Sequence, residues 1–219
     1  DDAQLARRVG QAVDSPPSSA RDALIEGLGR MRTPVSLEEL TRLSSGGLDD
    51  KRKVAEAIVG HGDRARKLAL TLAADPDAAV RANATWTLGF LGDAGAAKPL
   101  GGLVRDPDAA VAGNAAAALG RLARSLRKPD LAAGLCAALG DARPYVRANA
   151  IAGLDLAGHD CGVGPAAKLL SDDPSDVVRV AAARHLRRLA SRDKKNVERA
   201  LRRCALEERV HRVARACES

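Results

Sequence analysis

The sequence repeats itself about every 32 residues, and this repetition constrains the fold more than any other feature. The clearest pair is DPDAAVRANATWTLGFLG, residues 75–92, and DPDAAVAGNAAAALGRL, residues 106–122. Two further copies begin at Asp141 and Asp173, and weaker copies occupy residues 18–29, 49–62 and 210–217. A period of this length is typical of architectures in which each unit packs mainly on its neighbours.

Each strong copy predicts one helix with a defined start, an apolar face and an end. An aspartate precedes the helix, where its carboxylate accepts free backbone N–H groups. Proline follows in three copies, as Pro76, Pro107 and Pro174, and we expect it at the first helical position, where no N–H is needed. In the best copy, apolar residues then recur at helical spacing from Val80 to Leu91, and Gly92 ends the helix.

A shorter amphipathic helix, here called an A helix, is predicted between each of these helices, here called B helices, and the next. The predicted B helices lie near residues 18–30, 49–61, 76–91, 107–124, 142–157, 174–190 and 208–217. The predicted A helices lie near residues 34–43, 63–73, 96–104, 129–139, 165–170 and 194–206. One pair buries too little apolar surface to be stable alone, so the pairs must stack. We therefore predict an all-α fold, a right-handed α-solenoid of about six to seven helix pairs.

Composition supports this fold. The chain has 45 Ala and 28 Leu among 219 residues, and only one each of Trp, Tyr, Phe and Met, which argues against β-sandwiches and barrels. No apolar run is long enough for a transmembrane helix. We expect a single domain over residues 1–219, with an irregular first helix set apart by residues 14–19, DSPPSS. Because the chain starts at Asp1 rather than Met, we also expect it to be part of a longer protein.

The rhythm D-P-x-x-x-V-R-x-x-A-x-x-x-L-G resembles HEAT repeats, and especially the bacterial PBS-lyase HEAT-like class, which is related to armadillo repeats. The resemblance is strong from about residue 63 to 189 and weak outside. It implies that the B helices line a concave surface and that the motif Asp and Arg residues form a structural ladder between repeats. These residues are Asp75, Asp106, Asp141 and Asp173, with Arg81, Arg147 and Arg179. Ala112 stands where an arginine is expected, so the ladder should be interrupted there.

A second ladder is predicted from the asparagines three residues after each valine: Asn83, Asn114 and Asn149. They border the apolar stripe, where a buried amide needs hydrogen-bond partners. We expect them to bond to neighbouring helices rather than to the backbone of a ligand.

The helical register of the best copy places Trp86 opposite the core stripe, with Phe90 beside it. A large aromatic side chain on a concave surface is a common anchor for a protein partner. The alternative is that Trp86 and Phe90 fill the seam to the next repeat, where Ala117 leaves space. The segment NATWTLGFL also resembles armadillo repeats, in which a Trp and an Asn hold an extended peptide; Trp86 matches that Trp, and Phe90 replaces the Asn.

The net charge of +7 is not evenly distributed. Residues 179–219 hold 13 Lys or Arg and 5 Asp or Glu, a net charge of +8. The same register places Arg121, Arg184, Arg187 and Arg188 on the inner wall, so that one end of the groove is basic. Lys195, Arg199, Arg202 and Arg203 share one face of the last A helix, where a terminal repeat needs a polar surface.

No catalytic, cofactor or metal motif occurs in the sequence. The four cysteines form no CxxC pair, and we expect them to be small buried side chains rather than zinc ligands. One local cluster, His159, Asp160 and Cys161, has the residue types of a Cys/His site but lacks further ligands or an oxyanion donor nearby.

We therefore predict a non-enzymatic scaffold that binds a protein segment on its concave surface, with no cofactor and no metal. The partner-binding residues would be Trp86, Phe90, Arg121, Arg184, Arg187 and Arg188. One alternative is nucleic-acid binding through the basic C-terminal repeats; another is a lyase or glycosylase, since some HEAT-like relatives have those activities. Because the cysteines indicate small buried side chains rather than a cross-linked framework, we expect a reducing cytoplasm as the default location.

Overall fold

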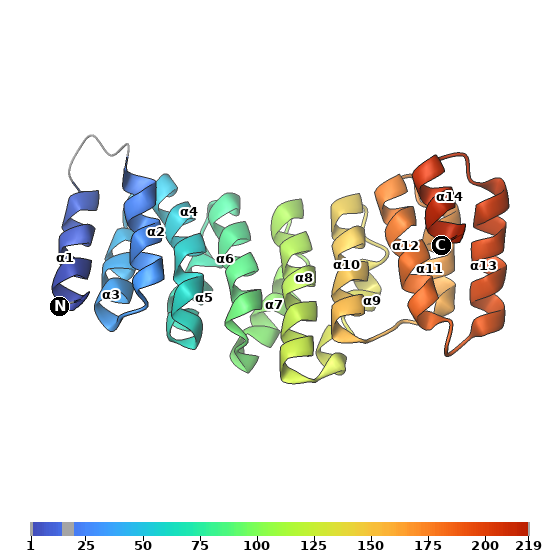
Figure 1. Cartoon of the computed structure of the whole chain (residues 1–219), viewed down its shortest axis with the longest axis horizontal. Coiled ribbons are helices and arrows are strands. Elements are labelled where there is room, and N and C mark those ends of the chain that lie inside the picture. The colour runs from blue at the N-terminus through green and yellow to red at the C-terminus, as the bar shows by residue number, and fades with distance from the viewer. Residues whose placement is uncertain (1, 15–19, 219) are drawn as a thin grey trace.

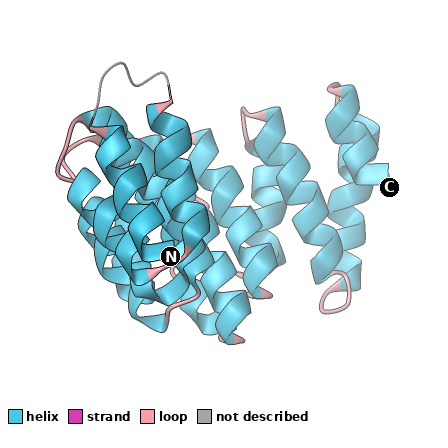
Figure 2. Ribbon diagram, turned by 60° about the vertical axis from the view of Figure 1, so that its left-hand side comes forward, coloured by secondary structure: helices cyan, strands magenta, loops and turns pink. Residues whose placement is uncertain are grey.

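The computed structural model describes residues 2–14 and 20–218. This part of the chain consists of helices joined by short loops, and no strand occurs in it (Figure 2). The all-α prediction is thus confirmed. Most of the predicted separator, residues 15–19, and the start of the first predicted B helix lie outside the described residues. Within the described ranges, no helix is both long and apolar enough to span a membrane.

The B helices stand side by side along the stack (Figure 1). They are α2 (Arg21–Met31), α4 (Leu48–Ala57), α6 (Ala78–Leu91), α8 (Ala109–Leu126), α10 (Pro144–Ala157), α12 (Asp176–Leu189) and α14 (His211–Glu218). The A helices are α3 (Pro34–Leu43), α5 (Arg66–Leu72), α7 (Ala97–Leu103), α9 (Leu135–Ala138), α11 (Val163–Asp172) and α13 (Lys194–Glu207). The first helix, α1 (Asp2–Val13), packs on α2 and α3.

Two predicted helices are shorter than expected because 3-10 turns replace part of them. The second B helix stops at Ala57 and continues as a 3-10 segment, Ile58–Ala65, in which Gly62 adopts a left-handed φ of 60°. The predicted A helix over 129–139 divides into the 3-10 turn Pro129–Ala132 and the short α9. A third 3-10 turn, Ala94–Ala96, precedes α7.

The stack bends toward its B helices. In the described part of the chain, every B helix packs on the next, whereas the A helices from α3 to α9 make little contact with one another. Glycines allow this close approach: a Cβ at Gly89 would lie 2.7 Å from the Cα of Ala118, and one at Gly153 would collide with the carbonyl of Ala116. The surface formed by the B helices, here called the B face, is therefore the inner side of the curve.

The interior is aliphatic. Val80, Ala84 and Leu88 of α6 are fully buried, as their spacing predicted, and so are Val111 and Leu122 of α8. The same stripe continues through α10 and α12, so that each repeat covers the apolar face of its neighbour.

The helix caps lie two residues later than predicted. Asp77 and Asp108 are the capping residues, and their carboxylates accept the N–H groups of Val80 and Val111. Asp75 and Asp106 instead accept the N–H groups of Asp77 and Asp108. The prolines expected at the first helical position lie before the helix, since α6, α8 and α12 begin at residues 78, 109 and 176. The motif aspartate thus closes the preceding turn.

The arginine that follows each valine joins two turns. Arg81 donates to the carbonyls of Asp75 and Pro76 and binds both carboxylate oxygens of Asp106, at 3.0 and 3.1 Å. Arg147 binds Asp173 in the same way, at 2.6 and 2.8 Å, with both side chains buried. On α12, Arg179 donates to the carbonyl of Asp173 and to both carboxylate oxygens of Glu208, which takes the place of the motif aspartate before the last B helix.

The expected interruption at Ala112 does not occur. Arg143, from the following turn, donates to the carbonyls of Asp106 and Pro107 at 2.8 and 3.0 Å, and to both oxygens of Asp141 at 2.9 Å. These are the acceptors that an arginine at position 112 would reach. The prediction was wrong because it assumed that the cation must come from the same position in every repeat.

The asparagines behave differently from one another. Asn83 donates to the carbonyl of Arg52 at 3.2 Å, and Asn114 donates to that of Ala82 at 3.0 Å, so both join neighbouring B helices. Asn149 was expected to do the same but donates to Tyr145 of its own helix at 2.9 Å. The Tyr145 ring lies against Gly113 in the seam between α8 and α10, close to Asn149.

The four cysteines form two disulfide bonds, which was not predicted. Cys136 of α9 is joined to Cys161 in the loop before α11, and Cys204 of α13 is joined to Cys217 of α14. Each bond links segments that are adjacent in the stack but 25 and 13 residues apart in the chain. Sequence spacing alone gave no such signal, because the pairs meet only after the helices pack.

Candidate binding groove

All three aromatic side chains of this protein are on its surface. The chain has one Trp, one Tyr and one Phe, and Trp86, Phe90 and Tyr145 are 39%, 49% and 48% exposed. Trp86 and Phe90 belong to α6, and Tyr145 belongs to α10. Aromatic side chains usually contribute large buried areas to a core. Here the core is aliphatic, and the aromatic surface remains available on the B face.

Trp86, Phe90 and Arg121 form a stack across two helices. The ring centroids of Trp86 and Phe90 are 4.4 Å apart, and the guanidinium carbon of Arg121, on α8, lies 4.3 Å from the centre of the Phe90 ring. Burial lowers the pKa of Arg121, because desolvation disfavours the charged guanidinium. Contact with the ring offsets part of this cost through a cation–π interaction.

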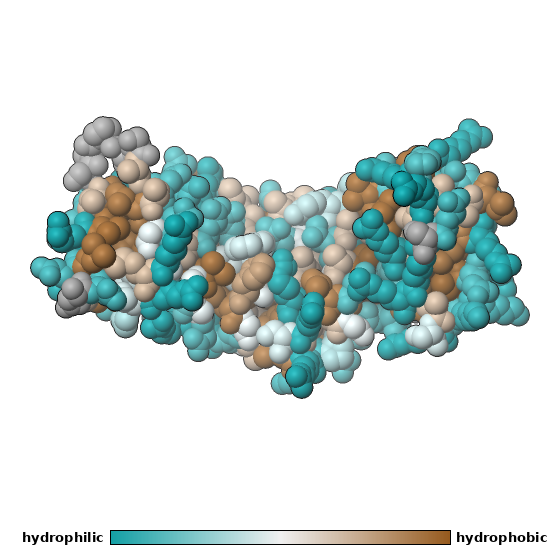
Figure 3. Space-filling view, in the orientation of Figure 1, coloured by the Kyte–Doolittle hydropathy of each residue, from teal (hydrophilic) through white to brown (hydrophobic). Residues whose placement is uncertain are grey.

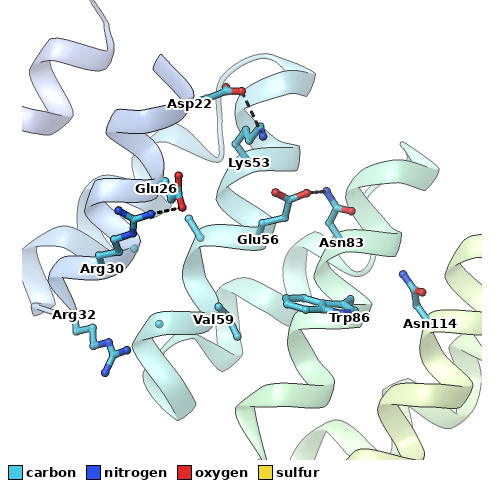
Figure 4. A pocket seen from close by; sticks show the side chains of 13 residues that line it. Asp22, Glu26, Arg30, Arg32, Lys53, Glu56, Val59, Asn83, Trp86 and Asn114 are labelled. Carbon is cyan, nitrogen blue, oxygen red and sulfur yellow. Dashed lines mark hydrogen bonds and ion pairs between the residues drawn. The ribbon is translucent and has the colours of Figure 1, made fainter. Parts of the chain in front are cut away.

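Trp86 also lines a groove that extends toward the N-terminal repeats (Figure 4). The groove has a volume of about 710 Å³, with Val59 and Asn83 near Trp86 and Asn114 on the far side. The sequence offered two positions for these aromatic side chains, the groove or the seam to the next repeat. The structure places the Trp86 ring at the groove and the Phe90 ring beside the seam between α6 and α8.

Most charged side chains of the groove have partners within the protein. Lys53 pairs with Asp22 at 3.4 Å, and Arg30 pairs with Glu26 at 2.6 Å. Glu56 accepts a hydrogen bond from Asn83 at 2.8 Å (Figure 4). The exposed Arg32, at the N-terminal end of the groove, has no carboxylate partner among the described residues.

The B face beyond the groove, toward the C-terminal repeats, differs. Arg121 and the exposed Arg184 of α12 form no ion pair with any described residue. Arg188 is less available, because it lies 3.7 Å from Asp155, which also bonds to the buried His185 at 2.6 Å. Arg187 is half-buried and is also engaged in an interaction. Of the four predicted inner-wall arginines, two are thus uncompensated.

Tyr145 was not among the predicted site residues. Its hydroxyl donates to Oδ1 of Asn114 at 3.1 Å, which places it next to the groove wall. Its exposure could have been predicted from the sequence. Tyr145 immediately precedes the core residue Val146, and the helical register turns it away from the core stripe.

The cluster of His159, Asp160 and Cys161 does not form a nucleophilic site. Cys161 is oxidised in the bond to Cys136, and Asp160 forms an ion pair with Arg192. His159 lies 3.7 Å from Asp130. Among the described residues, no group of three or more His, Cys, Asp or Glu side chains is arranged to hold a metal ion.

Much of the C-terminal positive charge is compensated locally. Arg203 pairs with Glu207, Lys194 with Glu198, and Arg212 with Asp176. Lys195, Arg199 and Arg202 remain exposed on the outer side of α13, away from the B face. Figure 3 shows the B face in the orientation of Figure 1, with apolar patches separated by hydrophilic side chains.

Comparison with known proteins supports the repeat assignment. The family model for HEAT repeats matches residues 48–120 and 63–135. No curated protein sequence matches the chain.

Solved structures with similar folds cover nearly the whole chain. The complex of CpcE and CpcF of phycocyanin lyase from Nostoc sp. PCC7120 is 18% identical, with a TM-score of 0.56, over 97% of this chain and 92% of that one. A designed armadillo repeat protein in complex with the peptide (KR)4 is 20% identical, with a TM-score of 0.55, over 96% and 95%. Human deoxyhypusine hydroxylase is 18% identical, with a TM-score of 0.52, over 99% and 94%. The fold of the chain is therefore that of an α-solenoid, and residues 48–135 match the HEAT-repeat model.

Proposed function

We propose that this protein is a non-enzymatic scaffold whose B face binds an extended segment of a protein partner. The observation that carries the proposal is the exposure of its three aromatic side chains on the B helices α6 and α10, above an aliphatic core. Exposed aromatic and arginine side chains dominate many protein interfaces. Trp86 and Phe90 would supply the apolar anchor, and Arg121 and Arg184 would pair with acidic groups.

Two of the predicted contacts are weaker candidates. Arg188 would have to share its charge with Asp155, and Arg187 is half-buried. Designed armadillo proteins of similar fold were made for modular peptide recognition or bind the peptide (KR)4, which supports a peptide ligand in general. In this protein Arg121 lies close to Trp86 and Phe90, which favours an acidic ligand rather than a basic one such as (KR)4.

We also propose that the protein works where disulfide bonds persist. All four cysteines are paired, and such bonds are rare in reducing cytosol. This favours an oxidising compartment over the cytoplasmic location expected from the sequence.

The binding proposal is tested by selecting ligands from a displayed library of random 16-residue peptides. The affinity of a selected peptide is then measured for the wild type and for Trp86→Ala. We expect at least a tenfold loss of affinity, because truncation of an interface Trp commonly costs more than about 1.4 kcal/mol. Leu206→Ala is the matched control, since Leu206 is 87% exposed outside the B face. Unchanged affinity for Trp86→Ala, or a loss explained by unfolding in a thermal melt, contradicts the proposal.

A further inference from the structure

The cations of the B face differ in whether they have a carboxylate partner. Arg30 and Lys53 have one, whereas Arg121 and Arg184, and Arg32 at the N-terminal end, have none among the described residues. The aromatic pair is on α6, which lies in the stack between α4, with Lys53, and α8, with Arg121. A ligand that runs along the B face from α6 toward α12 would meet an apolar surface first and two uncompensated cations next.

From this pattern, and resting on the proposed function, we infer that the partner segment is acidic and extended, with two carboxylates about six residues apart. One carboxylate would bind Arg121, the other would bind Arg184, and an apolar side chain two or three residues from the first would lie on Trp86.

The spacing follows from the stack. Arg121 is on α8 and Arg184 is on α12, with only α10 between them. Neighbouring helix axes are roughly 8–10 Å apart, so two steps span roughly 16–20 Å. Relative to Val111 and Val178, the two arginines are also about one helical turn out of register, which adds roughly 6 Å along the axis. The combined separation is roughly 20 Å, and an extended chain covers this in about six residues.

The position of the apolar residue follows from the aromatic stack. Trp86 and Arg121 both contact Phe90, at 4.4 and 4.3 Å from its ring centre. Their separation is therefore at most roughly 9 Å, which two or three extended residues cover. A carboxylate is favoured at Arg121, because the guanidinium is partly desolvated and a paired charge restores favourable electrostatics.

An extended occupant is distinguishable from a helical one. A helix rises about 1.5 Å per residue, so a helical ligand would need roughly 13 residues between the two carboxylates. A basic ligand would place like charges beside Arg121 and Arg184.

The experiment uses the full chain and a displayed library of 20-residue Gly/Ser peptides. Each peptide carries one Leu and two Glu, with the Glu–Glu separation varied from 2 to 14; a parallel set carries Lys instead of Glu. Enrichment is counted by sequencing for the wild type, Arg184→Ala, Trp86→Ala and the control Arg199→Ala, which removes a cation from the outer side of α13. We expect enrichment to peak at a separation near six, two- to fivefold above other separations, as one solvent-accessible ion pair would give. The peak should disappear in Arg184→Ala and persist in Arg199→Ala.

The other outcomes separate the two proposals. Trp86-dependent enrichment with no preferred separation, with a peak near 13, or with preference for Lys overturns the inferred partner but leaves peptide binding by the B face intact. Enrichment that is the same in the wild type and Trp86→Ala, while both variants remain folded in thermal melts, overturns the inference together with the proposed function.

Discussion

Arg143 binds Asp141 through two hydrogen bonds of 2.9 Å, although the two residues are separated by only one position in the chain. The third guanidinium nitrogen of Arg143, Nη1, donates to the carbonyls of Asp106 and Pro107, so that Arg143 links two repeats. The same acceptor geometry surrounds Arg81 and Arg147, which come from a different position in their repeats. The same arrangement of an arginine between two turns therefore recurs along the stack, although the sequence position that supplies the arginine differs.

This bridge predicts a rescue experiment. Arg143→Ala should lower the free energy of unfolding by about 1–2 kcal/mol, because charged hydrogen bonds to partly buried groups are lost. Adding Ala112→Arg should restore at least half of this loss, since residue 112 is placed to reach the same acceptors. Urea denaturation measures both values.

Ala112→Arg alone provides the control. It should destabilise the protein, because Ala112 is fully buried while Arg143 is present. If the double variant is no more stable than Arg143→Ala, the two positions are not interchangeable. The buried pair Arg147–Asp173 sets the scale, with an expected loss of about 3–5 kcal/mol for Arg147→Ala.

Close packing of the B helices predicts opposite effects at two glycines. Gly153→Ala should cost about 1–3 kcal/mol, because the new Cβ meets the Ala116 carbonyl and a methyl group of Leu135. Gly101→Ala, in α7, should stabilise the protein by about 0.5–1 kcal/mol, since nothing lies within 4 Å of its Cβ position. Thermal melts of both variants test the prediction; equal destabilisation would contradict it.

His61 predicts a loss of stability in mild acid. Burial lowers the pKa of its imidazole below 6.5, although Nε2 lies 3.3 Å from the Leu28 carbonyl. The folded state therefore favours the neutral ring, and the stability present above pH 6.5 falls as the pH drops below that value. His61→Gln should flatten this dependence between pH 7 and 5 in urea titrations. His211→Gln, at an exposed position, is the matched substitution control, and an unchanged slope for His61→Gln would refute the assignment.

A second acid transition is expected from the ladder. Hydrogen bonds from Arg143 and Arg179 hold the pKa values of Asp141 and Glu208 below their usual range. These groups stabilise the fold above pH 4–5, and the contribution is lost as the pH falls further. The His61→Gln variant allows this transition to be measured alone, because it removes the histidine transition that occurs at higher pH.

The disulfide bonds predict resistance to thiol reagents. Under non-reducing conditions, a maleimide should label none of the four cysteines, even in denaturant. The paired replacement Cys204→Ser/Cys217→Ser should lower the free energy of unfolding by up to about 3 kcal/mol, because the bond closes a loop of 13 residues. Stoichiometric labelling of all four thiols in freshly purified, unreduced protein would show that the bonds do not form.

The charge distribution predicts weak nucleic-acid binding. Several C-terminal cations are paired, and residues 179–219 contain no aromatic side chain for base stacking. We expect no electrophoretic shift of DNA or RNA at physiological salt. A shift that persists there and decreases in Lys195→Ala/Arg199→Ala/Arg202→Ala would revive the nucleic-acid alternative.

Local patterns determined most of the fold. The spacing of Val80, Ala84 and Leu88 predicts a helix and its buried side without reference to the rest of the chain, because helical periodicity is a local property. The same periodicity placed Trp86 and Phe90 outside the core. The helix starts were less accurate, since Asp75 and Asp77 both offer a capping carboxylate and only the geometry of the turn distinguishes them.

Only the tertiary structure decided the contacts between repeats. The pairing of Arg143 with the carbonyls of Asp106 and Pro107, the stacking of Arg121 on Phe90, and the meeting of Cys136 with Cys161 all join segments from different helices. Such contacts depend on helix rotation and separation to within a few ångströms, and small residues such as Gly153 set that separation. Sequence periodicity therefore specifies which side of each helix is buried, while packing decides which exposed side chains meet and what the surface they form can bind.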